Sequence, residues 1–369
     1  MDQKDERITI LIVDDVPENL ETLTGMLSRD YKVKVALNGK RAIQIAQSQP
    51  HPSLILLDVM MPEMDGYEVC RQLKNNALTR KIPIIFVTAL GDTEDEAKGF
   101  DAGGVDYIVK PVSLAIVRAR VKTHLALHDQ NLALEDLVRE RTAELNLTQD
   151  VTIFGLATLA EYRDNETGGH IIRTKNYVRV LAEHLKSHSK FRQHLDDETI
   201  ELLHKSAPLH DIGKVGVRDS ILLKPGKLTP EEFEEMKKHT TFGRDAILKA
   251  EETMGVSPKT SFLRFCREIA YSHQEKWDGS GYPEGLKGED IPISARLMAV
   301  ADVYDALISK RCYKPSFTHK KAVEILTEGK GSHFDPEIIE AFLKCENTFR
   351  EIAIENADYG EEIQNLKEN

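Results

Sequence analysis

The sequence predicts a multidomain protein: a doubly wound α/β domain of the flavodoxin-like type, then a helical linker, then an all-α domain. At 369 residues the chain is too long for one ordinary hydrophobic core. In its first part, short apolar runs alternate with amphipathic stretches, as in a parallel sheet covered by helices. From Val151 onward the pattern is predominantly helical. We place the α/β domain at residues 7–123, the linker at 124–150, the helical domain at 151–350 and a C-terminal tail at 351–369.

The composition excludes some classes of protein. A net charge of −12 argues against non-specific nucleic-acid binding, because no basic run offers the phosphate contacts that it needs. The four cysteines lie far apart and form no CxxC pair, which is typical of reduced thiols in a cytosolic protein. The N-terminal residues lack the apolar run of a signal peptide, and no stretch is long enough to span a bilayer. We therefore expect a cytoplasmic protein that binds neither nucleic acid nor membranes.

Polar side chains follow four predicted strands of the first domain, at the point where each strand ends. They are Asp14 and Asp15 after residues 8–13, Asp58 after 54–57, Thr88 after 84–87 and Lys110 after 107–109. Ligands of a parallel sheet bind beyond the carboxyl ends of its strands. Three clustered carboxylates favour Mg²⁺, and Asp58 would be the nucleophile for a phosphoryl group whose oxygens Thr88 and Lys110 hold. One strand-terminal Asp is often only a helix N-cap, but five such residues in order make that explanation weak.

At this point the chain resembles the receiver domain of bacterial response regulators. The segments LIVDDVPENL, LILLDVMMPEMDGYEV, FVTAL and DYIVKP carry the resemblance. It implies that Asp58 accepts phosphate from a cognate sensor histidine kinase, and that Asp14, Asp15 and Asp58 bind Mg²⁺. It also implies a cis peptide between Lys110 and Pro111, and a relay of the change through Thr88 and Tyr107.

The linker is predicted to be a helix. Residues 112–150 contain neither proline nor glycine and are rich in strong helix formers. Leu127, Leu134, Val138 and Leu145 lie on one stripe, with Asn131 on the same seam. A polar residue at such a position could fix the register of a parallel helix pair, which predicts a homodimer. Packing of the stripe on the protein's own domains is the alternative that the sequence leaves open.

The second half carries a series of side chains that bind metals. The series is Glu166, His170, His210, Asp211, His239, His273 and Asp302. Histidine and carboxylate together suit Zn, Mn and Fe, and an Asp directly after a His can bridge two metals. We expect His210 and Asp211 on a helix, His239 late in a helix, His273 at a helix end and Asp302 near the middle of an amphipathic helix. Each His alone is more often a capping or surface residue; the ordered set favours a metal site.

Here the sequence resembles the HD-GYP subgroup of the HD metal-dependent phosphohydrolases, over about residues 150–350. The motifs are ETGGHIIRT, LHDIGKVGV, MKKHTTFG, HQEKWDGSGYP and ADVYDAL followed by RCYK. That family is helical and cleaves the bacterial messenger cyclic di-GMP at a centre of two or three metals.

The resemblance implies roles for individual residues. The first metal would be held by His170, His210, Asp211 and Asp302, the second by Asp211, His239 and His273, and a third by Glu166. Lys214 and Asp211 would be catalytic, and the substrate would contact Lys214, Tyr282, Arg311 and Lys314. The metals would be divalent transition metals such as Fe or Mn, with Ni or Zn as alternatives. A diguanylate cyclase (GGDEF) protein is a candidate partner.

Two departures from the family pattern bear on function. Gln274 stands where the family usually has a second histidine, and an amide oxygen is a poorer ligand for a transition metal than imidazole. Cys312 replaces a proline that usually follows Arg311. We expect a response regulator that hydrolyses cyclic di-GMP to pGpG or GMP. The alternatives are a degenerate module that senses the nucleotide or docks a partner without turnover, and a phosphohydrolase that prefers pGpG or another cyclic dinucleotide.

Overall fold

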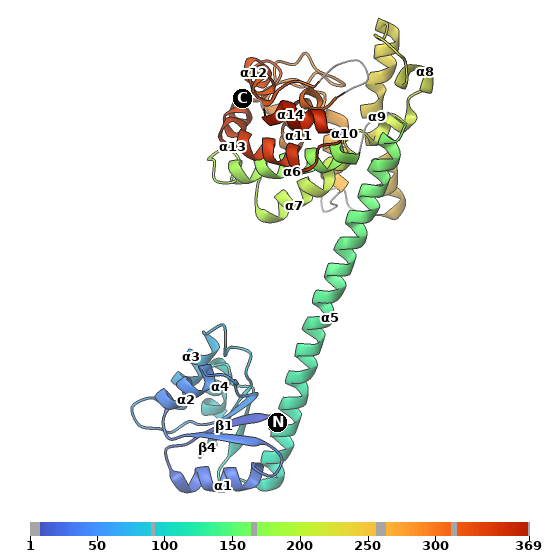
Figure 1. Ribbon diagram of the computed structural model, residues 1–369. Helices are drawn as coiled ribbons and strands as arrows, with labels where there is room; N and C mark the ends of the chain where they lie inside the picture. The colour runs from blue at the N-terminus through green and yellow to red at the C-terminus, as the bar shows by residue number, and fades with distance from the viewer. Residues whose placement is uncertain (1–7, 90–92, 164–167, 256–262, 311–315, 368–369) are drawn as a thin grey trace. The chain divides into compact units, whose positions relative to one another are not determined.

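A computed structural model of the chain describes residues 8–89, 93–163, 168–255, 263–310 and 316–367 (Figure 1). The chain divides into two compact units, Met1–Ala143 and Glu144–Asn369. In the described parts, no helix is both long enough and apolar enough to cross a bilayer.

The first unit contains a parallel sheet. Its strands are β1 (Thr9–Val13), β2 (Lys32–Ala36), β3 (Leu54–Asp58), β4 (Ile84–Thr88) and β5 (Asp106–Val109), in the order β2-β1-β3-β4-β5. Pairing is parallel throughout, so the carboxyl ends of all these strands meet at one edge. This arrangement confirms the predicted α/β fold. The strand β2 was not predicted from sequence, because it lies at the edge of the sheet and its residues are largely half-buried or exposed.

Helices cover both faces of this sheet. They are α1 (Pro17–Leu27), α2 (Gly39–Gln47), α3 (Gly66–Lys74), α4 (Thr93–Asp101) and the start of α5 (Leu114–Glu161). Apolar residues of α1 and α5 pack with Ile10, Ile12 and their neighbours on one face, whereas those of α2 and α3 pack with Leu11 and Val13 on the other. Successive strand residues therefore point into different cores, which explains why each strand is apolar throughout.

The predicted linker is part of one continuous helix, α5, which begins in the first unit and ends in the second. Val117, Val121 and Leu125 are buried against the sheet. The middle of the helix is exposed on all sides, and its last turns are buried again at Ile153, Ala157 and Ala160.

The second unit is helical in its described residues. Its α-helices after α5 are α6 (Gly168–Leu185), α7 (Asp197–Ser206), α8 (Asp219–Leu222), α9 (Pro230–Met254), α10 (Leu263–Ser272), α11 (Ile293–Ile308), α12 (His319–Glu328), α13 (Pro336–Glu355) and α14 (Gly360–Lys367). Most residues of α11 are buried, and this helix lies at the centre of the main core. A helix that is apolar on nearly all sides is expected in such a position.

Two local expectations differ from the structure. His210 and Asp211 do not lie on an α-helix: α7 ends at Ser206, and the pair stands between two short 3₁₀ segments, Ala207–Leu209 and Ile212–Gly216. His239 lies near the middle of α9, because that helix continues to Met254 before Gly255 ends it in a left-handed conformation, φ 64°. The helix starts with a capping box between Thr229 and Glu232, and this pair is a signal for the start of a helix that can be read in the sequence.

The last residues of the chain pack on the second unit. Within residues 351–369, α13 continues to Glu355 and α14 follows. The buried carboxylate of Glu362, in α14, accepts backbone N–H groups of Lys310 and Asp358 at 2.7 and 3.1 Å. Asn365 donates to the side chain of Ser316 at 2.7 Å. This segment is therefore part of the folded domain.

Candidate metal centre

Five segments of the second unit bring the expected ligands together. His170 comes from the first turn of α6, His210 and Asp211 from the 3₁₀ connection, His239 from α9, His273 from the residue after α10 and Asp302 from α11. The donors form two groups, His170–His210–Asp302 and Asp211–His239–His273, and within each group all donor atoms lie within 4.8 Å of one another. Since His210 and Asp211 are adjacent, the two groups are neighbours.

Each histidine is oriented by its Nδ1 atom. In His210, His239 and His273, Nδ1 lies 3.1, 2.8 and 2.9 Å from the backbone carbonyl three or four residues earlier. In His170, Nδ1 lies 2.8 Å from Oδ2 of Asp305. These partners are acceptors, so Nδ1 carries the proton and Nε2 keeps a lone pair. Metal-binding histidines are held in this way.

The Nε2 atoms point to positions that suit cations. Nε2 of His170 and Nε2 of His210 lie 3.3 Å apart, and two lone pairs at this distance are favourable only when a cation lies between them. Nε2 of His239 and of His273 each lie 3.4 Å from Oδ1 of Asp211. These three atoms are buried and have no hydrogen-bond partner in the described part of the chain. Buried polar atoms without partners are costly, and the donor set therefore fits divalent metals.

The electrostatics keep the second group in its metal-binding form. Burial raises the pKa of Asp211, but its neighbours, the Lys214 ammonium first among them, outweigh burial and hold this pKa well below its usual range. Burial lowers the pKa of His239 to about 4, more than the nearby Asp211 charge raises it. At neutral pH the carboxylate is therefore ionised and His239 is neutral, as metal ligation requires.

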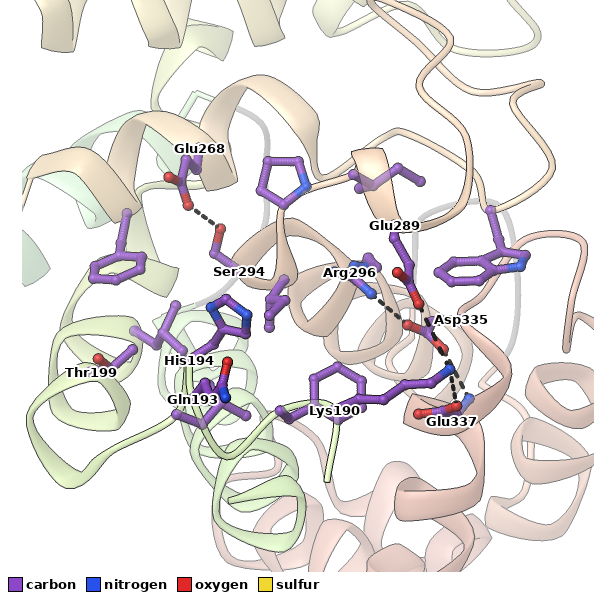
Figure 2. Close-up of a pocket in the computed structure, with 18 of the residues that line it drawn as sticks. Lys190, Gln193, His194, Thr199, Glu268, Glu289, Ser294, Arg296, Asp335 and Glu337 are labelled. Carbon is purple, nitrogen blue, oxygen red and sulfur yellow. Dashed lines mark hydrogen bonds and ion pairs between the residues drawn. The ribbon is translucent and has the colours of Figure 1, made fainter. Parts of the chain in front are cut away.

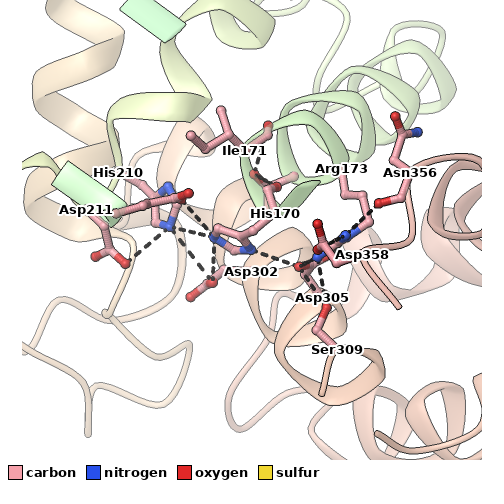
Figure 3. A network of polar contacts seen from close by, with 12 residues as sticks. His170, Ile171, Arg173, His210, Asp211, Asp302, Asp305, Ser309, Asn356 and Asp358 are labelled. Atoms are coloured by element: carbon pink, nitrogen blue, oxygen red, sulfur yellow. Dashed lines mark hydrogen bonds and ion pairs between the residues drawn. The ribbon is translucent and has the colours of Figure 1, made fainter. Parts of the chain in front are cut away.

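A buried ion pair supports His170 from behind (Figure 3). Asp305 lies one turn after Asp302 in α11 and receives the Arg173 guanidinium on both oxygens, at 2.7 and 2.9 Å. The other Arg173 N–H groups donate to the Asn356 carbonyl, Asp358 and Ser309 at 2.7–2.9 Å. All five N–H donors of this arginine are thus used. The C-terminal segment is thereby connected to a predicted metal ligand.

Sequence reasoning did not predict roles for Arg173, Asp305 or Asp358. Arg173 lies in the motif ETGGHIIRT, and Asp305 lies in ADVYDAL. Asp305 follows Asp302 by three residues, and this helical spacing was the available sequence signal that Asp305 lies near the site. No local pattern indicates Asp358, which lies 185 residues from Arg173 in sequence.

Close backbone approach explains one glycine beside the ligands. A Cβ on Gly213 would lie 1.9 Å from the carbonyl oxygen of His239, so no side chain fits there. Lys214, the next residue, places its ammonium 2.8 Å from Oδ2 of Asp211. The glycine thus allows the segment with the predicted catalytic lysine to lie directly on α9.

The Gly-Tyr-Pro loop is organised by Glu275. Its buried carboxylate accepts the backbone N–H groups of Glu284, Gly285 and Leu286 at 2.8–3.1 Å. Tyr282 is thereby held beside the centre, with its ring 6.3 Å from that of His239. Burial raises the pKa of Tyr282, and the charges of Asp211 and Asp302 raise it further, so its hydroxyl stays protonated. Sequence reasoning treated Glu275 only as part of a motif.

Three of the expected site residues cannot be placed. Glu166, Arg311 and Lys314 lie outside the described residues. Gln274 is half-buried and its backbone carbonyl accepts the N–H of Tyr282 at 3.2 Å.

A separate cavity of about 820 Å³ opens elsewhere in the second unit (Figure 2). Its walls carry both signs of charge, including Lys190 paired with Glu337 and Arg296 paired with Asp335 at 2.8 Å. None of the predicted metal ligands among the described residues lines this cavity.

The first unit brings its strand-end residues together as expected. Oxygens of Asp14, Asp15 and Asp58 lie within 4.8 Å of one another. Lys110 lies 2.8 Å from Asp14 and 3.1 Å from Asp58, and the peptide before Pro111 is cis. Burial raises the pKa of Asp58, although Lys110 lowers it in part. Oxygen ligands in this arrangement suit Mg²⁺.

The two switch residues also lie where they were expected. Thr88 ends β4 and is buried, while Tyr107 lies in β5 and is half-buried. The Tyr107 ring meets that of Phe100 edge-on at 6.2 Å between centroids.

Comparisons with known proteins agree with this geometry. A response regulator receiver domain matches residues 10–122, and an HD domain matches residues 157–338. A probable cyclic di-GMP phosphodiesterase of Vibrio cholerae is 51% identical, over 95% of this chain and 80% of its own length. The cyclic di-GMP phosphodiesterase response regulator RpfG of Xanthomonas campestris is 38% identical, over 79% of this chain and 75% of its own. A 3'3'-cGAMP-specific phosphodiesterase of Vibrio cholerae is 39% identical, over 60% of this chain and 38% of its own length.

The fold and the site define a class: a response regulator whose output domain is a metal-dependent hydrolase. The chain belongs to the family of HD-domain cyclic di-GMP phosphodiesterases that carry a receiver domain.

Proposed function

We propose that this protein hydrolyses cyclic di-GMP to pGpG and GMP at a centre of two metals, under the control of phosphorylation at Asp58. The observation that carries the proposal is the pair of adjacent donor groups joined by His210 and Asp211. Two such metals, when bound, supply an activated hydroxide and a clamp for the phosphoryl oxygens of a phosphodiester. The chain's own residues bind and orient the substrate.

Lys214 and Tyr282 are the described residues best placed to act on the substrate. The ammonium of Lys214 is largely buried beside Asp211, so its charge is little screened and attracts a phosphate group. The hydroxyl of Tyr282 is a donor at neutral pH, as in any tyrosine, and its raised pKa keeps it protonated under more alkaline conditions as well. Arg311 and Lys314 are proposed to bind the phosphates or guanine, as guanidinium and ammonium groups do.

The proposed metals are Fe or Mn, with Ni or Zn as alternatives. The second site has Asp211, His239 and His273, which leaves positions open for water and substrate. A third metal at Glu166 is a separate part of the proposal. Because Gln274 supplies no imidazole, we expect slow but real turnover.

Homodimerisation is proposed through the exposed middle of α5. Leu127, Leu134, Val138 and Leu145 are 48–66% exposed and recur at intervals of seven and four residues. A parallel pair with a second copy would bury this stripe and place Asn131 against its counterpart. Light scattering should give twice the monomer mass, and a monomer at micromolar concentration would refute this part. A cognate histidine kinase and a diguanylate cyclase are the further proposed partners.

The test is a comparison of substrates on protein of known metal content. Metal-loaded protein is assayed with cyclic di-GMP, pGpG and 3'3'-cyclic GMP-AMP side by side, with Asp211→Ala as the inactive control. Faster hydrolysis of cyclic di-GMP supports the proposal. Preference for cyclic GMP-AMP would favour the second candidate, which the relative with that specificity suggests. Two bound metals without hydrolysis of any of these substrates would favour a sensing module.

A further inference from the structure

An exposed aromatic side chain lies beside the candidate metal centre, at the start of α9. Phe233 is in the first turn of this helix, and 45% of its surface is exposed. Its ring meets that of Tyr282 edge-on, with 6.1 Å between centroids, and the Tyr282 ring lies 6.3 Å from that of His239. Tyr282 therefore connects a predicted metal ligand with an exposed aromatic surface earlier in α9.

A lysine lies over both of these rings. Nζ of Lys237 is 5.1 Å from the centroid of Phe233 and 5.6 Å from that of Tyr282, within the range of cation–π attraction. Lys237 follows Phe233 by four residues, so the two side chains share one face of α9. It also pairs with Glu234 at 2.7 Å, and the side chain of Glu234 is 69% exposed. Exposed contacts of both kinds contribute little, so Lys237 can turn its ammonium to a ligand at small cost.

The position of Phe233 suits the base of a bound nucleotide. When one phosphodiester group of the substrate lies at the metals, a base has to lie beyond them, because the sugar separates the base from the phosphate. Phe233 lies six residues before His239, which is about 9 Å along the axis of α9. Every base has a face that stacks on an aromatic ring. The exposed part of Phe233 therefore offers a stacking surface outside the metal centre.

The cation beside this surface distinguishes between purines. Guanine presents two acceptors, O6 and N7, on one edge, and an arginine or a lysine is their usual partner. Adenine carries an amino group where guanine has O6, so its N–H donors would face the ammonium. A base that stacks on Phe233 with this edge towards Lys237 is therefore bound more tightly when it is guanine.

We propose that Phe233 and Lys237 form a guanine-binding site at the start of α9: Phe233 stacks on one base of the dinucleotide, and Lys237 donates to O6 and N7 of that base. The proposal deepens the proposed function and rests on its substrate site. It names the residues that decide the preference for cyclic di-GMP over dinucleotides that contain adenine.

The test measures binding rather than turnover. Mn²⁺-loaded protein is titrated calorimetrically with phosphorothioate analogues of cyclic di-GMP and cyclic di-AMP, which resist hydrolysis. The wild type should bind the guanine analogue about tenfold more tightly than the adenine analogue, or better. Phe233→Ala should bind the guanine analogue about tenfold more weakly than the wild type, and Phe233→Tyr should retain the affinity, with equal metal content in all three proteins. Wild-type affinity in Phe233→Ala would overturn the proposal.

Two neighbouring lysines give a matched comparison. Lys237→Gln and Lys238→Gln each remove one charge from α9 and one ion pair with the glutamate three residues earlier. Lys237→Gln should reduce the preference for guanine about tenfold, because a glutamine also pairs with N6 and N7 of adenine, whereas Lys238→Gln should keep the preference of the wild type. Equal preference in the two variants would overturn the proposal. Because Lys237→Gln changes a surface residue, it also tests the site if Phe233→Ala does not fold.

Binding and hydrolysis are judged separately. The hydrolysis of cyclic di-GMP itself is assayed on the same wild-type protein. Protein that binds the guanine analogue without turnover of cyclic di-GMP refutes the proposed function and still tests the guanine-binding site. Wild-type protein that binds both analogues equally, or neither of them, overturns the guanine-binding site even where cyclic di-GMP is hydrolysed.

Discussion

Replacing Asp305 by Asn should weaken both the fold of the second unit and its first metal site. Oδ1 of Asp305 accepts Nε of Arg173, whereas Oδ2 accepts Arg173, His170 and Ser309. An amide has nearly the same shape, but in either orientation its NH₂ group faces at least one donor. The substitution also removes the charge that holds Arg173 in a buried position.

The expected magnitudes follow from these contacts. Breaking a buried ion pair by removing one partner costs about 3–5 kcal/mol. Asp358 still pairs with Arg173, so we expect the lower end, about 3 kcal/mol. His170 loses the partner that fixes its tautomer, and loss of such a partner typically lowers metal affinity about 10–100-fold.

Two measurements test this expectation. Urea unfolding gives the change in free energy of unfolding, and Mn²⁺ titration gives the affinity of each site. Ser309→Ala is the matched control, because it removes a hydroxyl that accepts from Arg173 and donates to Asp305 but leaves the ion pair and the partner of His170 in place. It should cost about 1.5–3 kcal/mol, with metal affinity unchanged. If Asp305→Asn binds Mn²⁺ like the wild type, the view that Asp305 orients His170 is wrong.

Three further predictions concern the receiver, the second metal and pH. Asp58→Asn should abolish Mg²⁺-dependent labelling by a small phosphodonor without changing the circular dichroism spectrum; labelling that persists would move the phosphoacceptor elsewhere. Gln274→His should raise the affinity of the second site for Mn²⁺ by more than about tenfold, and activity at limiting Mn²⁺ should rise. An Mn²⁺ affinity equal to that of the wild type would exclude position 274 as a ligand position. His319 is buried, and burial, with the charge of Arg350, lowers its pKa to about 4. As the pH falls below about 6.5, the unfolded chain takes up a proton at this histidine before the folded chain does. The free energy of unfolding should therefore decrease by roughly 1 kcal/mol between about pH 6.5 and about pH 4, after allowing for screening. His319→Gln should remove this dependence on pH, and an unchanged dependence would contradict the assignment.

Much of the fold follows from local pattern. The apolar runs that end in Asp14, Asp58 and Thr88 predicted strands of a parallel sheet, because residues buried on both faces leave an unbroken apolar signal. The strand at 32–36 was missed because it is an edge strand and carries a mixed pattern. The 3₁₀ geometry around His210 was also missed, since no side chain of that segment signals the tight approach of Gly213 to α9.

The residue types of the metal centre were determined by sequence alone. His170, His210, Asp211, His239 and His273 were identifiable because metal chemistry restricts ligands to few side chains, and the structure brings these residues together in two groups. Their order along the chain favoured a common metal site, and their role as ligands remains a prediction.

Only the tertiary structure decided what surrounds these ligands. Arg173 meets Asp305 across 132 positions and Asp358 across 185. Arginine and aspartate are common on protein surfaces, so their identity alone does not distinguish a solvated residue from a buried one. Their roles depend on which surfaces pack together, and that packing is set by the whole core rather than by neighbours in sequence.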